Sequence, residues 1–143
     1  MSFETDFLQA IQDNKYQNIV NDIAYAKFIG MRCESYGESM MFTLPANENN
    51  LGNPMIPAIH GGVLAGFMET AAMIQLMVLL QTPTIPKIVN ISFDYLRAGF
   101  HRDTFSECSI TRQGRRVANV NVRAWQKKRD EPLATARAHF LLS

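Results

Sequence analysis

The stretch from residue 61 to residue 80, GGVLAGFMETAAMIQLMVLL, sets the strongest limit on how this chain can fold. After the two opening glycines nothing in it breaks a helix, and the prolines of the following QTPTIP segment end the pattern. A helix of this length spans about 30 Å. Its side chains are apolar on every side, which predicts that the rest of the chain covers most of it.

The segments on both sides of this helix have strand patterns. Downstream, KIVNISFDYL, TFSECSITRQ, RVANVNVRAWQKK and LATARAHFLLS follow a period of two, and RQGRR and KKRDEP separate the last three as hairpin connections. Upstream, GMRCESYGESMMFTLP predicts a strand pair or one bent strand, with Gly37 at the turn or bulge. This order predicts an α+β domain in which an antiparallel sheet wraps one long central helix and the later strands form a meander.

The first part of the chain has a different pattern. Residues 3 to 14 place apolar side chains at helical spacing, which predicts a short amphipathic helix, and a loop or second helical turn continues to about residue 27. We therefore divide the chain into an N-terminal helical segment, residues 1 to 24, and a domain over residues 25 to 143. The segment ANENNLGNPMIP is rich in Asn, Pro and Gly and predicts an irregular loop that leads to His60.

The formal net charge of +1 hides an uneven distribution of charge along the chain. Residues 1 to 96 carry four Lys or Arg against nine Asp or Glu, and residues 97 to 143 carry ten against four. Solvated strand faces account for a basic second half, and an anionic ligand such as a nucleotide phosphate is the alternative. No recognisable nucleic-acid-binding motif accompanies the basic residues, so we expect no nucleic-acid partner.

Cysteine usage and the start of the chain predict a cytoplasmic protein. The opening MSFETDFLQA has no basic segment followed by an apolar one, and Cys33 and Cys108 lie far apart in the sequence, as expected of free thiols. Glu69 and Gln75 interrupt the only long apolar run, so we expect no membrane span. Neither the cysteines nor the three histidines have metal-ligand spacing, and we expect neither a metal nor a cofactor.

Glu69 is the only ionisable residue in the central helix. A structural interpretation pairs its carboxylate with a C-terminal arginine or places it at an exposed helix edge, and a catalytic interpretation makes it a base. It follows His60 by nine residues, which on a helix is two and a half turns and about 13 Å along the axis. One chain cannot easily bring both side chains to one substrate atom, whereas two antiparallel helices across a two-fold axis can.

The motif HGGVLAGFMETAA, followed by ISFDYLRAG, GRRVANVNVRAW and LATARAHFLL, resembles the hotdog-fold acyl-CoA thioesterases, specifically their phenylacetate-pathway (PaaI-like) branch. The resemblance covers residues 25 to 142, and its strongest element is His-Gly-Gly with an acid nine residues after the histidine. It implies a hotdog fold and hydrolysis of an acyl-CoA thioester to a free acid and coenzyme A. It also implies composite active sites at a dimer interface, in a homodimer or a dimer-of-dimers tetramer.

The resemblance assigns roles to four residues near the start of the helix. The backbone amide of Gly61 is the principal oxyanion donor, and the two glycines, Gly61 and Gly62, allow close approach to the substrate carbonyl. Glu69 is the general base or the nucleophile. His60 orients the loop through a hydrogen bond to the backbone, and is the less favoured choice for a catalytic base.

Other positions carry a weaker signal. Asn53 is a candidate to hold the attacking water or the thioester oxygen, but the usual site is one residue later, where this chain has Pro54. Met73 replaces the Ser or Thr that some relatives have one turn after the acid, and is either a core residue or part of an acyl tunnel. Three arginines are candidates to bind coenzyme A: Arg97, Arg115 and Arg116. They fall where the family holds the nucleotide and pantetheine, and the alternative is that they are simply solvated residues at strand ends.

Two other functions remain open at this stage. A hotdog dehydratase or hydratase needs a catalytic histidine well upstream of the helix in a His-Phe-Pro setting, which this chain lacks. A non-catalytic acyl-CoA-binding hotdog protein is the second alternative, although regulators of that kind carry a DNA-binding segment for which the roughly 25 leading residues are too few. The sequence does not identify the acyl group.

Overall fold

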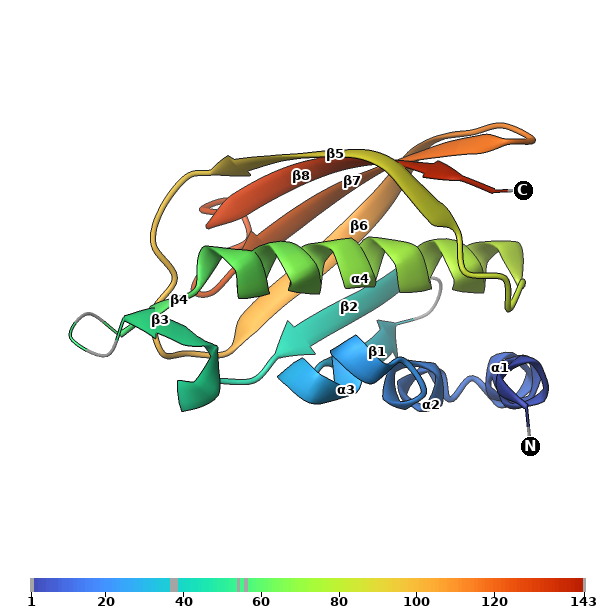
Figure 1. Ribbon diagram of the computed structural model, residues 1–143, viewed down its shortest axis with the longest axis horizontal. Coiled ribbons are helices and arrows are strands. Elements are labelled where there is room, and N and C mark those ends of the chain that lie inside the picture. Colours follow the sequence, from blue (N-terminus) through green and yellow to red (C-terminus); the bar gives the residue numbers. More distant parts are fainter. Residues whose placement is uncertain (1, 37–38, 54, 56, 143) are drawn as a thin grey trace.

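The computed structural model describes residues 2–36, 39–53, 55 and 57–142 (Figure 1). The helices are α1 (Phe3–Asp13), α2 (Tyr16–Asn21), α3 (Ala24–Ile29), the short 3-10 helix η1 (Glu48–Asn50) and α4 (Gly61–Leu80). The strands are β1 (Arg32–Tyr36), β2 (Ser39–Leu44), β3 (Leu51–Asn53), β4 (Ala58–Ile59), β5 (Lys87–Tyr95), β6 (Thr104–Gln113), β7 (Val117–Trp125) and β8 (Ala134–Leu141). The strand pair expected upstream of the helix is the β1–β2 hairpin, and Gly37 lies outside the described residues.

Six of these strands form one antiparallel sheet in the order β1-β2-β6-β7-β8-β5, and the sheet curves around α4 (Figure 1). The helix begins and ends where the sequence predicts, at Gly61 and Leu80. Its last turn closes at Gln81, which has a left-handed backbone and donates its N–H to the carbonyls of Met77 and Val78. The α+β class and the hotdog arrangement, an antiparallel sheet wrapped around one long central helix, are both confirmed.

The predicted four-strand meander is wrong for its first strand. The last three strands do follow one another as antiparallel neighbours, but β5 pairs with β8 instead of β6, and β6 pairs with β2. The connection of residues 96–103 is too long for a tight hairpin. It passes the start of α4 (Figure 1), where the Ile59 N–H donates to the Gly99 carbonyl at 2.8 Å. As a result β5 is an edge strand of the sheet.

The helix α4 is a core helix. Its buried residues belong to the hydrophobic core and include Phe67, Ile74 and Leu76, and each large apolar side chain contributes roughly 1.5–3 kcal/mol when it is fully buried. By length and composition alone α4 could also cross a membrane, but half of that stretch is buried inside the protein. Packing against the sheet and the N-terminal helices accounts for the buried half of this apolar helix.

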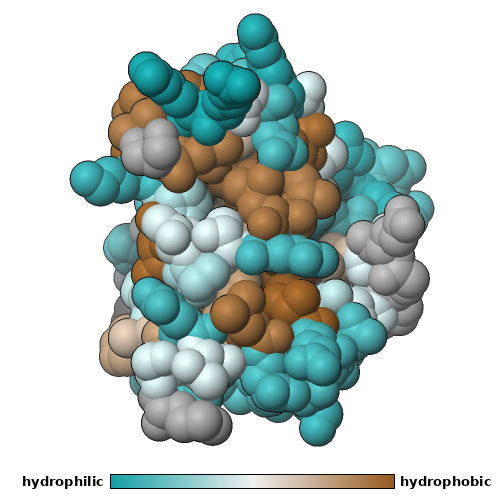
Figure 2. All heavy atoms as spheres, turned by 90° about the vertical axis from the view of Figure 1, so that its right-hand side faces the viewer, coloured by the Kyte–Doolittle hydropathy of each residue, from teal (hydrophilic) through white to brown (hydrophobic). Residues whose placement is uncertain are grey.

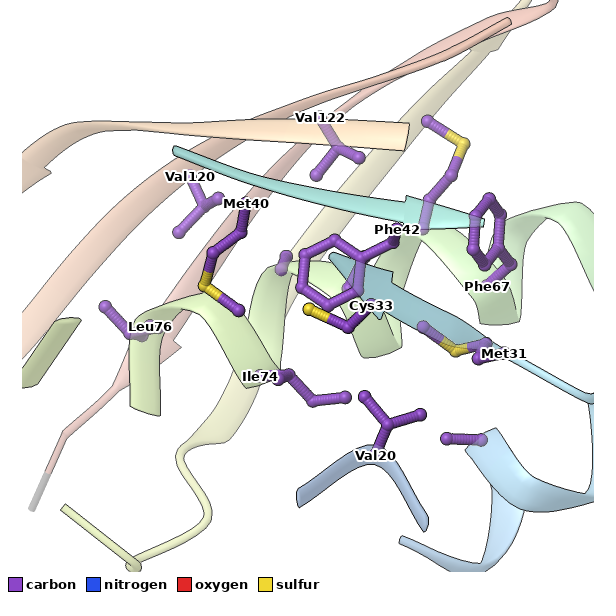
Figure 3. Close-up of a cluster of buried hydrophobic side chains, with 14 of the residues drawn as sticks. Val20, Met31, Cys33, Met40, Phe42, Phe67, Ile74, Leu76, Val120 and Val122 are labelled. Atoms are coloured by element: carbon purple, nitrogen blue, oxygen red, sulfur yellow. The ribbon is translucent and has the colours of Figure 1, made fainter. Parts of the chain in front are cut away.

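The N-terminal helices pack into the same core as the sheet. Val20 of α2, Cys33 of β1, Phe42 of β2 and Ile74 of α4 gather in one buried cluster (Figure 3). The predicted division between residues 24 and 25 falls at the start of α3. The helical segment therefore continues to Ile29 and supplies part of the core that holds α4.

Both cysteines are free thiols, with Cys33 buried in this core and Cys108 partly buried against it. Burial, followed by the nearby Glu34 carboxylate, raises the pKa of the Cys33 thiol to about 12. Burial also raises the pKa of Cys108, with smaller contributions from Glu107 and from Cys33 itself. The two thiols, distant in sequence, thus share one region of the interior.

Apolar side chains remain exposed along β5, in the last turn of α4 and in the loop that follows it. Val89 of β5 is 63% exposed, and Leu79 and Ile85 are exposed at the far end of the helix. Figure 2 views the end of the molecule where α4 finishes and the chain termini lie, and hydrophobic surface gathers there between hydrophilic groups.

Candidate active site

At the start of α4 one backbone N–H group has no acceptor among the residues that the structure describes. His60 is the N-cap residue, and its Nδ1 accepts a hydrogen bond from the Gly62 N–H at 2.9 Å. Val63 and Leu64 donate to the His60 carbonyl at 3.0 and 3.1 Å. The exposed Gly61 N–H has no acceptor among the described residues. Because it also lies at the positive end of the helix dipole, it is available to a negatively charged oxygen.

The bond between His60 and Gly62 also fixes the histidine ring. Since Nδ1 accepts a hydrogen bond, the neutral imidazole carries its proton on Nε2. A side chain at Gly62 would place its Cβ 3.0 Å from the Cε1 and Nδ1 atoms of His60, so a glycine there leaves room for the ring. The role of Gly62 in approaching substrate stays a prediction, as does a chemical role for His60.

Tyr95, which sequence reasoning missed, supports the same turn from the end of β5. Its hydroxyl donates to the Gly61 carbonyl at 3.0 Å, and its ring lies 3.7 Å from the point where a Cβ at Gly61 would be. The ring also stacks on Phe93, with centroids 6.1 Å apart. The signal in the sequence was the aromatic pair Phe93 and Tyr95 on one face of β5, because side chains two residues apart on a strand point the same way.

The loop before α4 is more regular than predicted. It contains η1 and a two-stranded ladder of β3 and β4. The His60 N–H donates to the Asn50 carbonyl at 2.9 Å, and Ala58 pairs with Phe100, so backbone hydrogen bonds compensate for the high Asn, Pro and Gly content. Asn53 pairs with Ala58 through its backbone. The Asn53 side chain and Pro54 lie outside what the structure describes.

Glu69 lies on a stripe of α4 that the fold leaves partly open. Gly62, Gly66, Glu69 and Met73 fall within roughly 60° of one another around the helix axis, and none of them is buried. No lysine or arginine lies within salt-bridge distance of Glu69 in the described ranges. The carboxylate is thus half-buried and without a cationic partner among the described residues of its own chain, as a carboxylate that meets substrate would be.

Gly61 and Glu69 do not meet within one chain. They lie on the same helix, eight residues apart, which separates them by about 12 Å along its axis. An oxyanion held by the Gly61 N–H is therefore out of reach of the Glu69 carboxylate of the same chain. A site that uses both groups needs a second copy of the helix.

Arg97 lines a cleft beside the start of α4. The cleft has a volume of about 340 Å³ and is also lined by Arg102, Lys127 and Glu131. Arg97 forms an exposed ion pair with Glu131, with the Nη1 and Oε2 atoms 3.8 Å apart. The sequence singled out Arg97 alone, because Arg102 and Lys127 come from separate loops that only the tertiary fold brings together.

Arg115 and Arg116 lie at the opposite end of the sheet from Arg97. They form the β6–β7 connection and line a second hollow with Arg112. The ten residues of β6 separate the two ends by about 30 Å. Within one chain, the three arginines selected from the sequence therefore do not form one group.

Comparison with known proteins identifies relatives of this arrangement. A model of the thioesterase superfamily matches residues 57–133, more than half of the chain. A Chromobacterium violaceum protein of known crystal structure is 41% identical, with 97% of this chain and 97% of that chain covered and a TM-score of 0.80. The E. coli PaaI protein from the phenylacetic acid degradation operon is 18% identical, with 99% and 96% covered and a TM-score of 0.77. A phenylacetic acid degradation-related protein from Ralstonia eutropha is also 18% identical, with 95% and 99% covered and a TM-score of 0.77. No curated protein matches the sequence.

The superfamily match includes the whole of α4 and the strands β5 to β7, and with them Gly61, Glu69 and Tyr95. At 18% identity, the two phenylacetic acid degradation proteins share the fold with this chain. The predicted resemblance is therefore confirmed for the superfamily and for the fold. The chain belongs to the thioesterase superfamily and has the hotdog fold.

Proposed function

We propose that the protein is an acyl-CoA thioesterase in which the Gly61 N–H of one subunit and Glu69 of the other act on one thioester carbonyl. The observation that carries this proposal is the hydrogen bonding of the backbone N–H groups in the first turn of α4. The N–H groups of Gly62, Val63 and Leu64 have acceptors, while the exposed Gly61 N–H has none among the described residues. A single preorganised donor of this kind stabilises the negative charge that develops on a thioester oxygen during attack.

Glu69 supplies the other half of the chemistry. As a general base it takes a proton from water while the water oxygen bonds to the carbonyl carbon, and the proton passes to the sulfur as the C–S bond breaks. As a nucleophile its carboxylate displaces the thiolate first, and water then hydrolyses the acyl-enzyme anhydride. Both routes give a free acid and coenzyme A, and both need the carboxylate ionised and open to substrate.

The edge strand β5 supports the assembly that this site requires. Antiparallel pairing of two β5 edges across a two-fold axis continues the sheet and makes the two α4 helices antiparallel. The Gly61 end of one helix then faces the Glu69 region of the other when the axis passes near residue 65. We expect a homodimer or a dimer of dimers, and only monomer in sedimentation at micromolar concentration would contradict this arrangement.

The basic clefts support binding of the coenzyme A phosphates. Three cations and one carboxylate line the cleft beside Arg97, which leaves a net charge of +2. Antiparallel pairing of β5 also brings the Arg115 end of one subunit toward the Arg97 end of the other, because Lys87 pairs with Leu141 and Leu141 with Val117. Arginines from both subunits are then available to one nucleotide.

A screen of acyl-CoA thioesters with detection of the released thiol tests the proposal. We expect hydrolysis of at least one straight-chain or aromatic acyl-CoA, at a rate that falls when Glu69 is replaced. No hydrolysis of any thioester, together with measurable binding of one, would favour the non-catalytic acyl-CoA-binding alternative.

A further inference from the structure

A tyrosine from the N-terminal helices lies directly on the open stripe of α4. Tyr25 is the second residue of α3, and its phenol reaches across to Gly66. A Cβ built at Gly66 would lie 2.3 Å from the Tyr25 hydroxyl oxygen, 2.7 Å from Cζ and 2.8 Å from Cε2. These distances are shorter than any real carbon contact, so the hydroxyl occupies the space where a side chain at position 66 would begin.

This position places the hydroxyl beside Glu69. Positions 66 and 69 are three residues apart, and side chains at that spacing start about 5–6 Å from each other on the helix surface. The phenol is 40% exposed, and its hydroxyl forms no hydrogen bond with any residue that the structure describes. An unpaired donor therefore lies within one helical turn of the carboxylate that acts on the thioester.

The charge state of the phenol fits a donor. Partial burial, and then the negative charge of Glu69, raise the pKa of Tyr25 above its ordinary value of 10.0. The O–H group is therefore intact at neutral pH and can donate a hydrogen bond.

We propose that Tyr25 is a specificity-determining residue of this site, and that its hydroxyl donates a hydrogen bond to an oxygen substituent on the acyl group of the bound thioester. The inference rests on the proposed function, since it needs a thioester held at Glu69. An acyl group next to Glu69 covers the Tyr25 hydroxyl and removes it from water. A covered hydroxyl without a partner is unfavourable, so acyl groups that carry a hydroxyl or keto oxygen are preferred over plain ones.

Matched pairs of substrates that differ by one hydroxyl group test this inference. Suitable pairs are butyryl-CoA with 3-hydroxybutyryl-CoA and benzoyl-CoA with 4-hydroxybenzoyl-CoA. Tyr25→Phe keeps the ring against Gly66 and removes only the hydroxyl. In at least one pair it should lower kcat/KM for the hydroxylated member about tenfold, while the plain member changes by less than about threefold.

Tyr16→Phe is the matched control, because it removes a hydroxyl from the same group of helices. The Tyr16 hydroxyl donates locally to Asn14 at 3.2 Å, so its loss should leave the ratio within each pair unchanged. Gly66→Ala is an independent second variant. Its new Cβ must displace the Tyr25 hydroxyl and should shift the same ratio in the same direction as Tyr25→Phe.

Unchanged ratios in every pair for Tyr25→Phe, or an equal loss for both members of each pair, would overturn the inference. Those results would leave the proposed function intact, because the wild-type protein would still hydrolyse thioesters. A wild-type protein that hydrolyses none of them would instead overturn the proposed function, and the inference with it.

Discussion

Replacing Gly61 with proline should abolish the oxyanion donor while preserving the fold. Proline is favoured at the first position of a helix, which is where Gly61 lies. The residue before a proline must be extended, and His60 already has φ −61° and ψ 130°. A Cβ at position 61 would lie 3.7 Å from the Tyr95 ring, which is an ordinary contact. The substitution therefore removes one N–H group and imposes little strain.

The size of the effect follows from the hydrogen bonds around Gly61. Loss of one oxyanion-hole donor typically lowers kcat by about 10²–10³, or roughly 3–4 kcal/mol. Here the N–H groups of Gly62, Val63 and Leu64 already have acceptors, so none of them is free to take over. We therefore expect the full loss. Gly61→Ala, which keeps the N–H, should lose less than about tenfold.

The assay is steady-state release of coenzyme A, with melting temperature and sedimentation measured on the same preparations. The expected result is a folded, associated Gly61→Pro protein whose kcat is at least about tenfold below that of Gly61→Ala. A proline variant as active as the alanine variant would show that this N–H does not hold the oxyanion. A variant that fails to associate would instead show that position 61 serves the interface.

Three further predictions follow from single contacts. Tyr95→Phe removes the donor to the Gly61 carbonyl, a bond worth about 0.5–1.5 kcal/mol, so kcat should fall about three- to tenfold with KM nearly unchanged; a rise in KM alone would contradict a positioning role. Arg97→Glu and Arg115→Glu should each raise KM for an acyl-CoA with little effect on kcat, and the increase in KM should be smaller at high salt. An unchanged KM would mean that both arginines are only solvated surface residues. The pKa of Cys33 is raised from 9.0 to about 12, so the folded chain keeps this proton where the unfolded chain has lost it. The free energy of unfolding should therefore fall as pH rises from about 9 toward 12. Denaturant titrations at several pH values in this range should show a smaller fall for Cys33→Ala than for the wild-type protein.

The sequence predicts the central helix well because its signals are local. The glycines, the uninterrupted apolar run and the following prolines define α4 from Gly61 to Leu80. The period of two locates β5 to β8 for the same reason. The pairing of β5 could not be predicted in this way. A strand pattern shows which residues face the core, but it does not show which strand lies next to it in the sheet.

The candidate site divides in the same way. Gly61 and Glu69 could be selected from their spacing along one helix, but Tyr95 and Tyr25 could not. Each reaches α4 from an element distant in sequence, and the aromatic pair of Phe93 and Tyr95 marks a shared strand face without showing that Tyr95 contacts Gly61. Gly66 gives an indirect signal of the Tyr25 contact. A glycine inside a helix costs about 1 kcal/mol of stability relative to alanine, so its presence suggests that a neighbouring group needs the space. The close approach of Tyr25 provides that reason.

The arginines show a further limit of sequence reasoning. Arg97 and Arg115 share a basic second half of the chain, yet the fold places them at opposite ends of the sheet. Composition records how much charge a segment carries, and only the strand topology decides where that charge lies. Whether both ends serve one ligand depends on a second subunit.

The most direct test of a shared site mixes Glu69→Gln chains with Gly61→Pro chains. Each variant alone should lose about 10²-fold or more in kcat, since one lacks the base and the other the oxyanion donor. A mixed dimer has one site that combines the intact Glu69 of one chain with the intact Gly61 of the other. After complete subunit exchange of equal amounts, half of the dimers are mixed and activity should recover to about a quarter of the wild-type value. No recovery in a mixture whose exchange is demonstrated would contradict a site built from two subunits.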